Sequence, residues 1–121
     1  MLEIYNEHIH DLFIDPKERP KEGLKIWESK DDGIYVENLR EIYVTSYDDI
    51  ANQIEKGTSN RTIAYTNMNA TSSRAHTVVT ISFKQTFFVS GRPTNQKLSK
   101  INMVDLAGSE RADTIGDDSK R

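Results

Sequence analysis

The feature that most constrains this chain is the string DLAGSE over residues 105–110, in which an acid ends an apolar run and a glycine-bearing loop follows. Ligands of open α/β sheets bind beyond the carboxyl ends of strands. Asp105 in such a place can hold magnesium through water, because magnesium keeps much of its hydration shell. Gly108 lets a backbone N–H approach a phosphate with no side chain in the way. An acid and a glycine at this spacing also cap ordinary turns, but the whole string is far more specific.

A second string, NATSSRAH over residues 69–76, supplies two hydroxyls and one fixed cation. Of Ser72 and Ser73, one hydroxyl could ligate magnesium and the other could orient an attacking water. Arg74 and Glu110 carry opposite charges, so a salt bridge between them would close a site over a nucleotide. The alternative interpretation of this string is a polar loop with an exposed arginine.

The phosphate-gripping loop G-x-x-x-x-G-K-[ST] is missing from the sequence, since none of the six glycines is followed by lysine. That loop supplies contacts to the β- and γ-phosphates in P-loop nucleotide hydrolases. The 121 residues form at most one ordinary domain, and strand-like alternation begins directly after Met1. We therefore expect a piece of a larger domain that carries the sensing half of a nucleotide site.

Composition narrows the classes of partner. The formal net charge of −3 argues against nucleic acid as the main partner, because phosphate backbones need a basic face. The absence of cysteine excludes disulfides. No apolar run approaches the roughly 20 residues of a membrane span, and no signal peptide precedes Glu3. We expect a cytosolic chain without a membrane span.

Hydrophobic periodicity and turn residues predict several strands, one helix and polar connections. The best helix covers residues 46–56, with Ser46 as its cap, Asp49 in the capping-box position and Gly57 as its stop. Residues 58–75 have loop character. The expected strands lie at residues 2–13, 24–27, 34–36, 41–44, 79–83 and 101–104. The first of them runs into an irregular or helical turn. Residues 24–27 and 34–36 form a hairpin after a loop over 15–23, and residues 79–83 and 101–104 form an antiparallel hairpin.

Together the two strings resemble the switch I and switch II pair of kinesin motor domains. The resemblance runs nearly end to end, and residues 33–39 and 44–50 are most similar to the kinesin-3 branch. It implies an α/β fold, the central part of a kinesin-type P-loop NTPase motor domain, with a mixed β-sheet and flanking helices. Residues 1–121 would be a partial motor domain, with the P-loop upstream and the main microtubule-binding helix downstream. Ala75 departs from the family pattern, which usually has serine there.

The resemblance also implies roles residue by residue, in a reaction that depends on positioning and charge stabilisation. His76 stands apart from these roles, because it opens a strong strand and favours a structural role. The implied catalytic residues are Ser72 beside the lytic water, and Arg74 and Glu110 as a latch, with Glu110 relaying the proton. The implied cofactor-binding residues are Asn69, Ser73 and Gly108, and the implied magnesium ligands are Ser73 directly and Asp105 through water.

The function implied by the resemblance is that of a fragment of a microtubule-based motor ATPase, with ATP or ADP and magnesium as cofactors and microtubules as partner. Its location would be the cytoplasm and the cytoskeleton, and the parent could carry a coiled coil. Without the P-loop, we expect the chain alone to be inactive and to self-associate through exposed strand edges. Asp31 and Asp32 place acid in a lobe where some members carry basic residues against acidic tubulin. The alternative is a non-catalytic kinesin-like module that binds tubulin or a partner chain.

Overall fold

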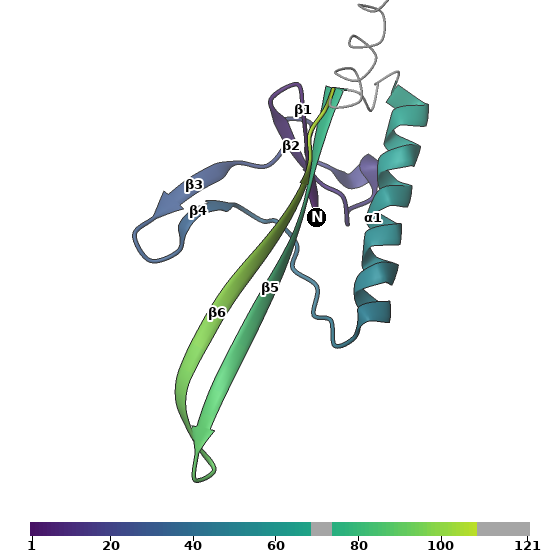
Figure 1. The fold of residues 1–121 in the computed structure, drawn as a ribbon. Coiled ribbons are helices and arrows are strands. Elements are labelled where there is room, and N and C mark those ends of the chain that lie inside the picture. Colours follow the sequence, from purple (N-terminus) through teal and green to yellow (C-terminus); the bar gives the residue numbers. More distant parts are fainter. Residues whose placement is uncertain (69–73, 109–121) are drawn as a thin grey trace, which may run out of the picture.

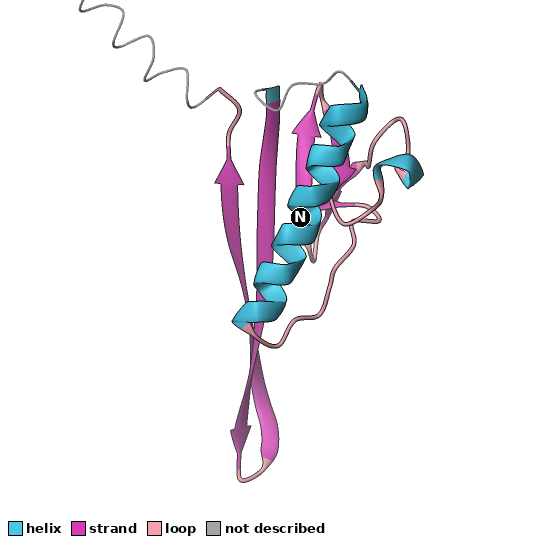
Figure 2. Cartoon of the chain, turned by 90° about the vertical axis from the view of Figure 1, so that its right-hand side faces the viewer, coloured by secondary structure: helices cyan, strands magenta, loops and turns pink. Residues whose placement is uncertain are grey.

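The computed structural model describes residues 1–68 and 74–108 of the chain. Its main sheet has four strands in the order β2-β1-β5-β6, and the helix α1 (Tyr47–Met68) lies along one face of it (Figures 1 and 2). Every pairing among the described strands is antiparallel. The four strands are β1 (Leu2–Tyr5), β2 (His8–Asp11), β5 (Ala75–Val89) and β6 (Arg92–Asp105).

A long hairpin formed by β5 and β6 dominates the molecule. The expected antiparallel pairing is confirmed, and it extends from Thr77 opposite Asp105 to Val89 opposite Arg92. The two strands reverse direction at residues 90 and 91, whose φ angles of 52° and 75° are both left-handed, as in the two-residue turns that match strand twist. The part of the hairpin on either side of the turn at residues 90 and 91 extends well beyond β1 and α1, and we call it the arm (Figure 1).

The first strand differs from the prediction. Residues 2–13 form a second hairpin, in which β1 and β2 pair from Leu2 opposite Asp11 to Tyr5 opposite His8. The chain reverses at Asn6 and Glu7, which both have positive φ angles, 49° and 66°. Neither residue is glycine, and this two-residue turn therefore carries a weak sequence signal.

The helix α1 begins where the sequence predicts and ends twelve residues later than predicted. Ser46 Oγ accepts a hydrogen bond from the Asp49 N–H at 3.1 Å, so the predicted cap is confirmed. Gly57 does not stop the helix, and the predicted loop from residue 58 is wrong as far as Met68. A Cβ at Gly57 would run into the Met1 side chain, so this glycine permits close packing of the helix against the N-terminus.

Three smaller elements complete the description. The predicted hairpin is confirmed as β3 (Ile26–Ser29) and β4 (Gly33–Val36), which form a separate two-stranded sheet to one side of the molecule (Figure 1). The expected loop over 15–23 contains the short 3₁₀ helix η1 (Pro16–Glu18). The expected strand at 41–44 is wrong, since these residues are irregular.

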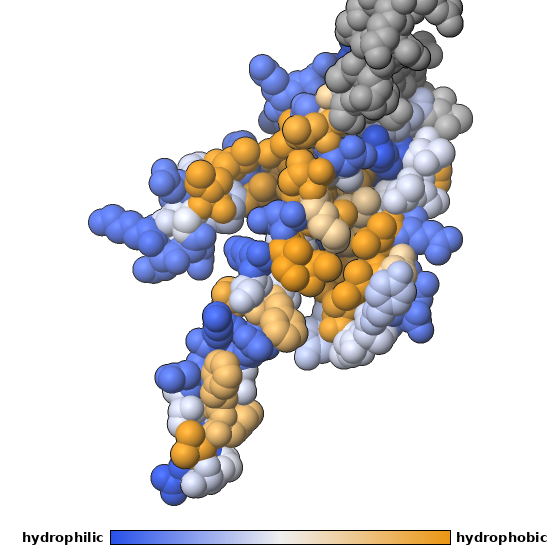
Figure 3. Space-filling view, in the orientation of Figure 1, coloured by the Kyte–Doolittle hydropathy of each residue, from blue (hydrophilic) through white to orange (hydrophobic). Residues whose placement is uncertain are grey.

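The core between α1 and the sheet is small. Its buried apolar members are Ile9, Leu12, Ala64 and Ala75, of which Leu12 is fully buried. Many large apolar side chains are exposed, and Figure 3 shows them gathered between the upper part of β6 and α1 and again along the arm. Within residues 1–68 and 74–108, no helix has the length and apolar character needed to cross a membrane.

Candidate functional site

The β5–β6 ladder brings the two expected switch segments to one end of the sheet. Arg74 directly precedes β5, and Asp105 is the last residue of β6. Because the strands are antiparallel, the start of β5 and the end of β6 lie at the same end of the sheet. Thr77 is there directly opposite Asp105. The C-terminal end of α1 lies at this same end of the molecule (Figure 1).

A row of polar residues crosses all four strands at this level. Glu3 is opposite His10 on one side and Thr77 on the other, and Thr77 is in turn opposite Asp105. Directly opposite residues point to the same face of a sheet. That face is the one covered by α1, because Tyr65 of α1 is hydrogen-bonded to Glu3. Glu3 and Thr77 are buried, whereas Asp105 at the edge of the row is exposed.

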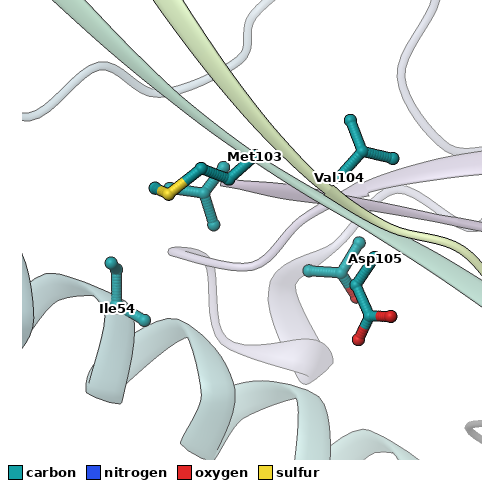
Figure 4. A pocket seen from close by; sticks show the side chains of 6 residues that line it. Ile54, Met103, Val104 and Asp105 are labelled. Atoms are coloured by element: carbon teal, nitrogen blue, oxygen red, sulfur yellow. The ribbon is translucent and has the colours of Figure 1, made fainter.

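A hollow of about 280 Å³ opens beside Asp105, between β5, β6 and the helix (Figure 4). Figure 4 shows Val104 and Asp105 on opposite sides of β6, with Asp105 on the side of α1. The Thr77 hydroxyl is buried there and has no hydrogen-bond partner among the described residues. The hollow is lined by Ile54, Thr77, Val79, Met103, Val104 and Asp105.

The donor atoms of this corner fit magnesium. An exposed carboxylate at the end of β6 and an unpartnered hydroxyl opposite it are both hard oxygen donors, the kind that magnesium binds. Magnesium is held by only one or two protein oxygens and keeps several waters, so a site of this openness suffices. The described residues that could hold magnesium are Asp105 and Thr77. Nothing in the sequence marks Thr77 as a site residue except its position after His76.

Gly108 has a left-handed backbone conformation, in an open position. Its φ angle is 82°, and a Cβ added there would meet no atom within 4 Å. One residue earlier, the Ala107 N–H donates a hydrogen bond of 2.9 Å to Nδ1 of His76, near the start of β5. The loop after β6 is therefore tied to the strand that follows the first switch segment.

Four of the expected site residues lie outside the described residues: Asn69, Ser72, Ser73 and Glu110. Arg74 is described and is exposed. The latch between Arg74 and Glu110 and the roles of the three polar residues in the first switch therefore stay predictions.

A buried cluster anchors the end of α1 to the centre of the sheet. The Tyr65 hydroxyl donates a hydrogen bond of 2.6 Å to Oε2 of Glu3, which is only 3% exposed. Arg61 Nε lies 3.7 Å from the same oxygen, and its guanidinium lies 5.6 Å from the centre of the Tyr65 ring. Tyr5 packs edge-on against Tyr65 with 6.3 Å between ring centroids. The contacts of Glu3 and Tyr5 with the helix join residues about sixty positions apart, and no local pattern in the sequence indicates them.

The cluster perturbs the acidity of its tyrosine. Burial, and then the hydrogen bond to Glu3, raise the pKa of Tyr65 to about 12. The protonated hydroxyl is therefore the form that the folded chain favours, since only that form can donate to the carboxylate.

Comparison with known proteins gives the family. The kinesin motor domain profile matches residues 1–121. Human kinesin-like protein KIF1B is 49% identical over 118 residues, which are 95% of this chain and 6% of that protein. Kinesin-like protein Klp98A of Drosophila melanogaster is 45% identical over 120 residues, 99% of this chain and 9% of that protein. A solved structure of a fast kinesin superposes with a TM-score of 0.77 at 38% identity, covering 89% of this chain and 28% of that one.

The chain belongs to the kinesin motor domain family. The predicted fold class, a partial α/β motor-domain fold, is confirmed by the superposition. The predicted resemblance to the kinesin-3 branch is confirmed by KIF1B, KIF13A and Klp98A, which are 44–49% identical. The chain spans less than a tenth of the length of these three relatives.

Replacing Tyr65 by phenylalanine tests the anchor. The change removes a hydrogen bond to a buried carboxylate, and we expect the free energy of unfolding to fall by about 1 to 3 kcal/mol in urea titrations. Tyr43→Phe is the matched control, because Tyr43 is 93% exposed, and it should leave the stability unchanged. Equal stability of the Tyr65→Phe chain and the wild type would contradict the anchor.

The same variant has a pH signature. The pKa of Tyr65 is about 12 in the folded chain and about 10 when unfolded, so its contribution is fully present below pH 10 and is lost as the pH rises toward 12. We expect the stability difference between wild type and Tyr65→Phe to narrow over that interval, measured by urea unfolding at fixed pH values.

Proposed function

We propose that this chain is the part of a microtubule-based motor ATPase that senses the γ-phosphate of ATP and its magnesium ion. The observation that carries the proposal is the convergence of two strand ends, with Arg74 before β5 and Asp105 at the end of β6 beside an unpartnered buried hydroxyl. Kinesin motor domains generally bind ATP or ADP with magnesium. The solved structure of the fast kinesin was described in terms of an ATPase mechanism and interactions with microtubules.

Under this proposal the end of β6 supplies the charge and backbone contacts of the site. Asp105 would hold magnesium through water and Ser73 would ligate it directly, while the buried Thr77 hydroxyl lies opposite Asp105 as a further oxygen. Bound magnesium neutralises charge that develops on the β- and γ-oxygens during phosphoryl transfer. The N–H of Gly108 reads the γ-phosphate, because glycine has no side chain to block the approach and adopts the left-handed backbone found here without strain.

The first switch supplies water positioning and closure. Asn69 and Ser72 orient the lytic water, and the pair formed by Arg74 and Glu110 closes the site and relays a proton. Such a pair is worth more in a partly dry cleft than at the surface, where it contributes about 0–1 kcal/mol. The anchored end of α1 gives this segment one fixed end, because Tyr65 is tied to Glu3 four residues before Asn69.

We also propose microtubules as partner and the cytoskeleton as location. The support is the family and the relatives, all of which are kinesins. The β3–β4 lobe carries an acidic turn, in which Ser29 Oγ accepts hydrogen bonds from the N–H groups of Asp31 and Asp32, each at 3.2 Å. Two carboxylates at this turn weaken attraction to an acidic track, so this turn is a poor candidate for the contact.

Nucleotide affinity of the isolated chain is the first test. None of its six glycines is followed by lysine, so the contacts that grip the β- and γ-phosphates are missing from it. We expect the purified chain to show no micromolar binding of a fluorescent ATP analogue in an anisotropy titration with magnesium. A motor domain that contains this segment together with a phosphate-gripping loop is the control and should bind. Micromolar affinity of the chain alone would overturn this part of the proposal.

Removing the latch in such a motor domain is the second test. Arg74→Ala and Glu110→Ala should each lower kcat by on the order of a hundredfold or more, because positioned charges supply much of the catalysis. The double variant should be little worse than either single one, since the two residues act as a unit. Arg92→Ala, which removes an exposed arginine at the tip of the arm, is the control and should retain full turnover. Unchanged ATPase rates in both latch variants would exclude the motor assignment of these residues.

Self-association of the isolated chain is the third test. The strand β6 ends the order β2-β1-β5-β6, so fourteen residues present an unpaired edge, with Leu98, Ile101 and Val104 more than half exposed. Such an edge pairs readily with another chain. We expect the apparent mass in light scattering to rise with concentration, and Val104→Lys to reduce that rise. Ile34→Lys places the same charge on β4, at a residue 73% exposed, and should not reduce it. A monomer at all concentrations would contradict the expectation.

A further inference from the structure

We propose that His76 is a positioning residue, which holds the loop of the phosphate-sensing Gly108 by accepting a hydrogen bond from the Ala107 N–H. The inference rests on the proposed function, because it assumes that Gly108 reads a phosphate. It assigns to His76 a part in the reaction that the sequence alone did not favour.

The geometry is that of a well-formed bond between two strand ends. His76 is the second residue of β5 and pairs directly with Ile4 of β1, so its backbone belongs to the interior of the sheet. Ala107 lies two residues beyond the end of β6. The distance of 2.9 Å between Ala107 N and His76 Nδ1 is in the normal range for a hydrogen bond. The bond spans 31 positions of the chain and is partly buried.

Little else among the described residues fixes this loop. Leu106 is 58% exposed, and a side chain at Gly108 would touch nothing within 4 Å. Side-chain packing at Leu106 and Gly108 therefore contributes little to the position of this loop, although Ala107 and Gly108 are half-buried. The His76 bond fixes the peptide between Leu106 and Ala107, which directly precedes the peptide that carries the Gly108 N–H.

The chemistry of the acceptor narrows which side chains can do this. When Nδ1 accepts, the neutral imidazole carries its proton on Nε2. An asparagine places its amide oxygen where Nδ1 lies, whereas a glutamine places its oxygen where Nε2 lies. Leucine matches the bulk of the ring and offers no acceptor. This difference in reach separates an acceptor at Nδ1 from a ring that merely fills space.

The bond itself can be observed directly in the full chain. An N–H···N hydrogen bond transmits a ¹⁵N–¹⁵N scalar coupling between donor and acceptor nitrogens. We expect a resolved coupling between the Ala107 amide nitrogen and His76 Nδ1, together with imidazole ¹⁵N shifts of the Nε2–H tautomer. An Nδ1–H tautomer, or no coupling for an assigned Ala107 amide, would overturn the inference whatever the activity of the protein.

The functional consequence is tested in a motor domain that contains this segment. His76→Leu should lower kcat by on the order of ten- to a hundredfold, because small misplacements of a positioning group have effects of that size, while the KM for ATP changes little. His76→Asn should retain most of the turnover, and His76→Gln should resemble His76→Leu. Thermal melts should show that all three variants are folded. If one variant does not fold, its turnover is set aside and the inference is tested by the ¹⁵N coupling in the wild type.

Each outcome decides between roles. Equal losses in the asparagine and glutamine variants would show that His76 acts only by packing and would overturn the inference. Full turnover in all three variants would do the same. A wild-type motor domain that hydrolyses no ATP would instead overturn the proposed function, and the ¹⁵N coupling would then show whether the bond between His76 and Ala107 exists independently of it.

Discussion

The site depends on the register of one antiparallel ladder. Because Thr77 of β5 lies opposite Asp105 of β6, residues separated by almost thirty positions reach the same corner of the sheet. A slip of one residue would turn every side chain of β6 to the opposite face and would remove the Asp105 carboxylate from the face that α1 covers. The two-residue turn at 90 and 91 sets the pairing at the far end of the hairpin, and a register shift between Phe87 and Phe88 separates that pairing from the register at Asp105. The pairing of β1 with Ala75 to Val78 holds the near end of β5.

The helix supplies the second constraint on that corner. Its C-terminal turns are held by a hydrogen bond to a carboxylate on the central strand β1 rather than by apolar packing alone. Burying Glu3 costs free energy unless the charge is paired and hydrogen-bonded. Tyr65 and Arg61 meet that requirement from the helix side. A directional contact of this kind sets where the helix ends relative to the sheet more sharply than an apolar contact would.

Local signals in the sequence predicted the elements whose ends they mark. Ser46 announced the start of α1, and the alternation after residue 77 announced β5 and its partner. Local signals led to wrong predictions where the structure depends on contacts between residues far apart in the sequence. Gly57 reads as a helix stop, yet it lies in the middle of the helix, where its missing side chain leaves room for Met1. The Glu3–Tyr65 and His76–Ala107 bonds join segments 62 and 31 positions apart, so periodicity could not reveal them. The two switch strings predicted a nucleotide site at this corner, and that site stays a prediction.

The small core and the unpaired flank of β6 both leave much of the sheet exposed to solvent. A chain of this size buries only about two thirds of the surface that its unfolded form exposes. Among the described residues the buried apolar ones are only Ile9, Leu12, Ala64 and Ala75, while many large apolar side chains along β5 and β6 stay exposed. Among the described strands, the order β2-β1-β5-β6 leaves one flank of β6 unpaired, and Met103, Val104 and Asp105 of this strand line the hollow. A strand added there would cover part of the exposed apolar surface of β6 and would satisfy the backbone groups along its open edge. The same edge that leaves the sheet open to self-association is therefore where a further strand would stabilise it.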